Sequence, residues 1–204
     1  MENKYEKLNR IYSNPTNLMI IYLLLENESL TVTDMSKNLN MTRANLYRTV
    51  KNLVDENILL EGKTVVEKNY VKKYYSLNLE FFSSIKAAEQ LDYIEKLDSE
   101  PFAEMLSSFF TSQSAFLNLQ AQKINSMGRE SRKQLKEKLT GDNFLFSFSS
   151  LENASFEKYL KRMKEVVAQM EKEDDELNQK DMKIGDNILL ILAMPVIRMG
   201  DIGK

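Results

Sequence analysis

Side chains that could contact nucleic acid gather between residues 42 and 73 of the 204-residue sequence. Arginine and asparagine form bidentate hydrogen bonds with the guanine and adenine edges in the major groove, whereas lysine and threonine bind phosphate oxygens. The candidates for base or near-base contact are Arg43, Asn45, Tyr47 and Arg48. The candidates for phosphate contact are Thr42, Lys51, Lys63, Lys68, Lys72 and Lys73. The alternative is that these residues only form a solvated surface, as on any exposed helix.

The charge of the chain is unevenly distributed. Its formal net charge is −2, yet the stretch from Met35 to Lys73 carries eight basic and four acidic residues. That stretch therefore has a net charge of +4, which leaves −6 for the rest of the chain. A phosphate backbone responds to local positive charge, whatever the total.

Two short helices and a hairpin are expected to position these residues. The first helix runs from Thr33, its expected cap, to Leu39, and Asn40 can adopt the left-handed conformation that ends helices. Thr42 caps a second helix that runs to about Glu56. Its buried face consists of residues spaced i, i+4, i+7, namely Leu46, Val50 and Leu53.

A hairpin pattern follows the second helix. Ile58–Val66 and Tyr70–Leu79 are rich in β-forming residues and flank a polar tip at Glu67–Asn69. Helix, tight turn, helix and hairpin is the order of a winged helix-turn-helix.

The same residues resemble ArsR-type transcription regulators over residues 15–79. The resemblance is carried by Thr33-x-Met35-x-x-x-Leu39, Met41-Thr42-Arg43, Leu46-Tyr47-Arg48-x-Val50-x-x-Leu53 and Lys73-Tyr74-Tyr75-x-Leu77. It implies a dimer that binds double-stranded DNA. The sequence departs from the pattern at Asn40 and Asn57, where such domains often have glycine. It also lacks Cys and His, so the metal sensing known in part of that family has no ligands here and no cofactor is expected.

Helices dominate the predicted remainder of the chain. Residues 1–12 form a short helix, and Pro15 opens a helix that is apolar nearly all round up to Leu25. Three further helices are predicted at Phe81–Leu97, Phe102–Met127 and Arg129–Leu139. We expect two domains, a winged domain over 1–79 and a dimerisation or effector domain over 80–204.

The C-terminal residues 142–197 predict strand, helix, strand. Phe144, Phe146 and Phe148 alternate with other residues as in a strand, a helix starts at Ser155, and Asn187–Ile197 is continuously apolar. Two strands rarely form a stable sheet alone, so they join the wing's sheet or pair with a second copy. The fold class is therefore mainly α with small β elements.

Surplus apolar surface favours a homodimer. The helix Phe102–Met127 has a wide apolar face, and Phe109 and Phe116 lie two turns apart on it. The predicted dimer contacts are Phe102, Leu106, Phe109 and Phe116.

An apolar effector is a further hypothesis. A pocket for an apolar small molecule could be lined by Phe144, Phe146, Phe148, Tyr159 and Met163. The alternative is that these residues are simply core packing.

Composition argues against several other classes. No Gly-rich phosphate loop or nucleophile elbow occurs and Cys and His are absent, so no enzyme is predicted. The charged N-terminus and the absence of a 20-residue apolar run predict a cytoplasmic protein without membrane contact.

Two hypotheses remain: a dimeric, sequence-specific DNA-binding regulator, and a winged-helix protein-interaction module in a larger assembly that does not bind DNA. The basic residues of the second helix and the wing favour the regulator.

Overall fold

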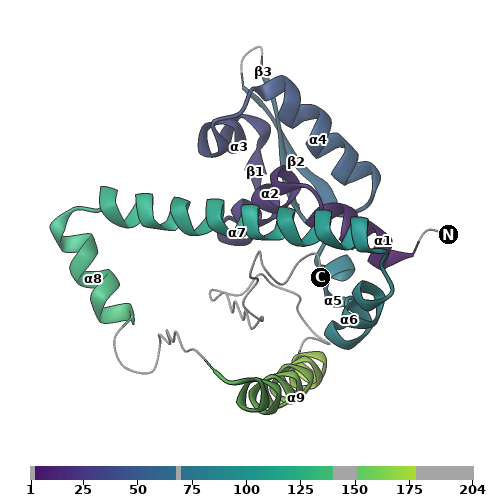
Figure 1. The fold of residues 1–204 in the computed structure, drawn as a ribbon. Helices are drawn as coiled ribbons and strands as arrows, with labels where there is room; N and C mark the ends of the chain where they lie inside the picture. The colour runs from purple at the N-terminus through teal and green to yellow at the C-terminus, as the bar shows by residue number, and fades with distance from the viewer. Residues whose placement is uncertain (1–2, 68–69, 140–150, 178–204) are drawn as a thin grey trace.

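The computed structural model describes residues 3–67, 70–139 and 151–177. A winged helix-turn-helix lies against one long helix, α7 (Ser99–Ser126), which runs past it on one side (Figure 1). The predicted fold class is confirmed: the described residues are mainly helical, with a small three-stranded sheet. The division into domains at residue 79 stays a prediction.

The first two helices begin where their caps predict. In α1 (Lys4–Tyr12), Asn3 and Glu6 form a reciprocal capping box. In α2 (Pro15–Glu26), the Asn14 side chain accepts hydrogen bonds from two backbone N–H groups, and Pro15 occupies the first turn, where its missing N–H costs nothing. As predicted, α2 is buried nearly all round.

The sheet contains one strand that the sequence analysis missed. Strand β1 (Leu30–Thr31) pairs with β3 (Tyr70–Leu77), which also pairs with β2 (Leu59–Glu67), and both pairings are antiparallel. The predicted last strand was two residues too long because Asn78 leaves the sheet. Its amide donates to the Asn57 carbonyl at 2.8 Å, and its side-chain oxygen accepts from the Phe81 N–H at the start of the next helix.

The core of the winged domain joins α1 and α2 to α3 (Val32–Leu39), α4 (Arg43–Asp55) and the sheet. Ile20, Leu24, Met35, Leu46 and Ile58 are completely buried in it. Each such side chain contributes about 1.5–3 kcal/mol of burial free energy, so these elements fold as one unit.

The single helix predicted over Phe81–Leu97 is wrong, because two helices occupy this stretch. They are α5 (Leu79–Ser83) and α6 (Ala87–Glu95). Ser84 ends α5, and its hydroxyl donates to the Phe81 carbonyl at 2.7 Å, while Lys86 is extended. A local hydrogen bond of this kind competes with continued helix.

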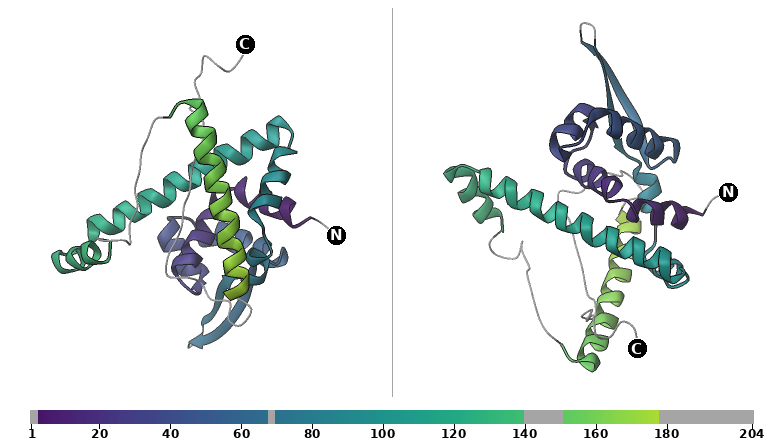
Figure 2. Two further views of the ribbon diagram at one scale, coloured as in Figure 1. Left: turned by 90° about the horizontal axis from the view of Figure 1, so that it is seen from below. Right: turned by 45° about the horizontal axis from the view of Figure 1, so that its top comes forward.

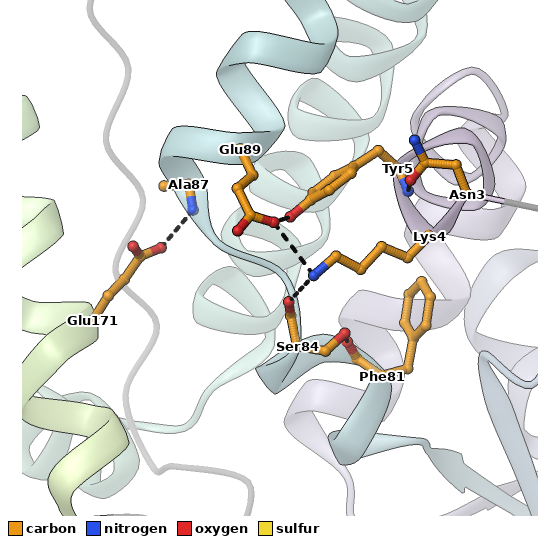
Figure 3. Close-up of polar contacts among 8 residues, drawn as sticks. All are labelled: Asn3, Lys4, Tyr5, Phe81, Ser84, Ala87, Glu89 and Glu171. Carbon is orange, nitrogen blue, oxygen red and sulfur yellow. Dashed lines mark hydrogen bonds and ion pairs between the residues drawn. The ribbon is translucent and has the colours of Figure 1, made fainter.

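Side chains from helices distant in sequence bind the backbone on both sides of the break between α5 and α6 (Figure 3). Lys4 of α1 donates to the Ser84 carbonyl at 2.6 Å and forms an ion pair with Glu89 at 3.4 Å, and the Tyr5 hydroxyl also bonds Glu89. Glu171 of α9 (Asn153–Leu177) accepts a hydrogen bond from the Ala87 N–H at 2.7 Å. A carboxylate from another helix therefore supplies the N-terminal cap that α6 lacks locally.

The long helix α7 (Ser99–Ser126) packs along α2 and reaches α1. It starts earlier than the predicted Phe102, with Asp98 at its N-cap and Pro101 in its first turn. The Phe116 ring lies 4.5 Å from the Tyr22 ring, and the Phe109 ring meets the edge of Tyr12 at 6.1 Å. The face assigned to a dimer seam is thus largely used within one chain.

The rest of the described chain comprises α8 (Arg129–Leu139), as predicted, and α9 (Asn153–Leu177), which starts two residues before the expected Ser155. Figure 2 shows α8 at the far end of α7 and α9 beside α6. The predicted strands around Phe144–Phe148 and Asn187–Ile197 lie outside the described residues. None of the described helices is long and apolar enough to cross a membrane.

The turn between α3 and α4 depends on a left-handed residue, Asn40, with φ 51°. Since Ala lacks the tolerance of Asn for this conformation, Asn40→Ala should lower the free energy of unfolding by about 1 kcal/mol, whereas Asn40→Gly should change it little. Urea unfolding followed by circular dichroism measures both. As a control, Asn52→Ala on the exposed side of α4 should leave stability unchanged or slightly raised. Equal stability of Asn40→Ala and the wild type would contradict this account of the turn.

Candidate nucleic-acid interface

The helix-turn-helix is fixed at its start by a capping box on α3. The cap is Thr31 and not Thr33 as predicted: its hydroxyl oxygen accepts from the Asp34 N–H at 3.2 Å, and Asp34 accepts from the Thr31 N–H at 3.3 Å. Thr31 also ends β1, so one residue joins the first helix of the motif to the sheet. The sequence analysis missed this because it did not recognise β1.

The turn into α4 is held by two bonds between Ser36 and Met41. The Ser36 hydroxyl donates to the Met41 carbonyl at 2.6 Å, and the Met41 N–H donates to the Ser36 carbonyl at 3.3 Å. Between them Asn40 is left-handed, as expected, and so is Asn57 after α4, with φ 60°. Both asparagines occupy conformations for which glycine is the usual choice.

Helix α4 presents two distinct faces. Leu46, Val50 and Leu53 are at most 2% exposed, which confirms the predicted inner face. The side chains of Arg43, Asn45, Arg48 and Lys51 are exposed, and none forms a hydrogen bond or ion pair with another described residue. Thr42 occupies the N-cap position as predicted, but its side chain makes no capping hydrogen bond. Its hydroxyl is therefore available to another acceptor or donor.

The other end of α4 is tied to α1. The Lys7 ammonium donates to the Glu56 carbonyl at 3.1 Å, and Arg10 lies 3.4 Å from the Glu56 carboxylate. Because α1 also packs on α2, the orientation of the exposed face of α4 is set by the core of the domain.

The base of the wing adjoins α4 at Tyr47, whose side chain is 51% exposed. Lys73 on β3 forms an ion pair with Glu61 on β2 at 2.7 Å. The hydrogen bond with this carboxylate raises the pKa of Lys73, and the neighbouring Tyr47 contributes in the same direction. Lys73, predicted to bind phosphate, is thus already engaged by an acidic neighbour.

The outer wing carries exposed apolar side chains beside its lysines. Lys63 and Lys72 are exposed, Lys72 also interacts within the chain, and Lys68 lies outside the described residues. Three apolar or aromatic side chains are exposed there: Val66 is 69%, Val71 59% and Tyr70 74% exposed. Val66 pairs directly with Val71 across the hairpin. The sequence analysis did not single them out, although cross-strand pairing two residues from the tip would have placed both valines on one face.

Of the residues predicted to line an effector pocket, Tyr159 and Met163 lie in the part of the chain that the structure describes, and the pocket stays a prediction. Tyr159 is 51% exposed on α9 and Met163 is half-buried, while Phe144, Phe146 and Phe148 lie outside the described residues. Within the part of the chain that the structure describes, no group of three or more acidic side chains could hold a metal ion.

Comparison with known proteins agrees with this geometry. Residues 13–59 match a family described as winged helix-turn-helix DNA-binding. No curated protein sequence matches the chain.

Three solved structures are similar. One is a Halomicrobium mukohataei protein with a GntR superfamily winged-helix-turn-helix domain, at 17% identity over 74% of this chain and 90% of that chain, with TM-score 0.34. The adhesin competence repressor of Streptococcus pyogenes is 20% identical over 60% and 75%, with TM-score 0.27. PadR of Bacillus subtilis, in complex with operator DNA, is 21% identical over 78% and 94%, with TM-score 0.28.

The matched residues span α2, α3, α4 and the start of β2. The chain therefore contains a winged helix-turn-helix of the DNA-binding type.

Proposed function

We propose that the protein is a dimeric, sequence-specific transcription regulator that reads the major groove of double-stranded DNA with α4. The observation that carries the proposal is the exposed polar face of α4, where Arg43, Asn45 and Arg48 lie opposite a fully buried apolar face. Arginine and asparagine are the side chains that discriminate guanine and adenine. The fixed turn before α4 and the α1 contact after it hold that face in one orientation.

Phosphate contacts come from the surroundings of that face. Thr42, Lys51 and Lys63 are exposed and have no partner among the described residues, so they can bind phosphate without breaking an internal bond. Lys73 would have to exchange Glu61 for a phosphate. We therefore assign the larger electrostatic contribution to the α4 side of the interface and the smaller one to the base of the wing.

The proposal includes a homodimer and a location for its contact. The ArsR-type resemblance supports the dimer. Its contact is suggested by apolar side chains of α7 that remain exposed although this helix packs on α2. These are Phe102, Leu117 and Ile124, which are 40%, 54% and 43% exposed. We place the contact with a second copy on this surface.

A protein-interaction module is the second candidate. It is favoured by the exposed end of the wing at Val66, Tyr70 and Val71, where the two valine side chains cannot bind phosphate. The salt dependence of DNA binding separates the two candidates.

DNA binding by the full chain should weaken steeply with salt. If each subunit of a dimer neutralises about four phosphates, the logarithm of the association constant should fall with the logarithm of salt concentration with a slope of about −7. Fluorescence anisotropy with a duplex from the protein's own promoter region measures the slope. A slope near zero would contradict the DNA-binding proposal and favour the interaction module.

Arg48→Ala should relax discrimination at one base position of each half-site and cost about 1–3 kcal/mol at the preferred site. Lys51→Ala is the matched comparison on the same exposed face, and it should weaken specific and non-specific DNA alike. Binding to a panel of single-base operator variants decides between these roles. If Arg48→Ala weakened every duplex equally, Arg48 would be a phosphate contact.

Leu117→Asp should shift the protein toward monomer at micromolar concentration, because it places a charge in the proposed contact without removing a side chain that packs inside the protomer. Thr111→Asp, exposed on another face of α7, is the control and should leave the association unchanged. Sedimentation equilibrium measures both variants. Phe109→Ala is not a suitable test of the dimer contact, since it also removes the contact with Tyr12 within the protomer. An unchanged dimer in Leu117→Asp would exclude this face.

A further inference from the structure

A groove of about 400 Å³ lies where α7, the N-terminal part of α2 and the turn before α4 meet. Figure 1 shows α7 running across α2, with α3 on the side toward the wing. The volume is within the range of about 300–1,000 Å³ that small-molecule sites occupy. This groove is separate from the exposed face of α4 and from the residues predicted to line a pocket.

The chemistry of the groove is uniform in one respect: no charged side chain lines it. Its apolar surface comes from Met19 of α2, Leu39 and Met41 beside the turn, and Leu119 of α7. Amide side chains and the Thr16 hydroxyl supply the polar surface. The amide side chains of Asn118 and Gln122 lie one turn apart on α7 and form no hydrogen bond with other described residues.

From this combination we infer that the groove binds an uncharged small molecule with an apolar body and an amide, carbonyl or hydroxyl group. Free amide groups both donate and accept hydrogen bonds, so they suit a neutral polar group. A carboxylate or an ammonium ion would lose water here without gaining a counter-charge. The class of ligand therefore follows from the apolar and uncharged polar side chains among the eleven lining residues, none of which is charged.

The position of the groove gives binding a structural consequence. Asn40 and Met41, which form one wall, immediately precede Thr42 at the start of α4. A molecule in the groove would contact this turn and α7 at once. The inference concerns binding alone and does not rest on the proposed DNA recognition.

Benzamide and benzoate test the inference because they share a shape and differ in charge. In ¹⁵N-labelled full chain, benzamide should shift the side-chain amide signals of Asn118 and Gln122 and saturate with a dissociation constant on the order of 1 mM, as befits so small a probe. Benzoate should bind at least about tenfold more weakly, which corresponds to a difference of about 1.4 kcal/mol. Equal binding of the two probes, or no shift with benzamide, would overturn the inference.

A matched pair of variants locates the site. Ala115 and Ala121 are both exposed on α7, but only Ala115 lines the groove. Ala115→Trp should abolish the benzamide shifts and Ala121→Trp should retain them. Retained binding in Ala115→Trp would place the site elsewhere. Should Ala115→Trp fail to fold, the comparison of benzamide with benzoate on the wild type still decides the matter.

Discussion

The structure depends on covering α2, a helix with almost no polar face. Five of its twelve residues are buried and two of them, Ile20 and Leu24, are completely inaccessible. A helix that is apolar all round has to be enclosed on every side. The helix-turn-helix and the sheet cover one side, and α1 and α7 cover the other. The DNA-binding unit therefore cannot be understood without the helix that follows it in the chain.

That enclosure gives the contact between α2 and α7 a mixed character. The Phe116 ring packs at a tilt against Tyr22, and the Gln113 amide donates to the Tyr22 hydroxyl. Ser112 is completely buried, and its hydroxyl donates to the Ser108 carbonyl one turn earlier at 2.8 Å. Gln120 and Lys123 both bind the Glu26 carboxylate. Directional bonds of this kind fix one register and one crossing angle, whereas apolar contacts alone tolerate sliding. The orientation of α7 relative to α4 is thus well defined within one chain.

The wing shows how one hairpin serves two environments. Near its base, Tyr75 and Leu77 are buried in the core and the Glu61–Lys73 pair adjoins Tyr47 of α4. Beyond the register shift between Glu61 and Thr64, the strands leave the core and expose Val66 and Val71. Positive side chains, Arg43, Arg48 and Lys51, are exposed on α4, whereas the far end of the wing exposes apolar ones.

The sequence by itself determined the elements whose signals are local. Asn40 and Asn57 end helices in the left-handed conformation, Pro15 opens α2, and the spacing of Leu46, Val50 and Leu53 fixes which face of α4 is exposed. Tertiary structure alone decided what depends on residues distant in the chain. Strand β1 exists because Leu30 and Thr31 meet β3, and the helix predicted over Phe81–Leu97 divides where Lys4 and Glu171 bind its broken ends. The spacing of Phe109 and Phe116 fits a dimer seam and an internal contact equally well, because periodicity shows which face is apolar and not what covers it. Only the positions of Tyr12 and Tyr22 show that this chain itself covers Phe109 and Phe116.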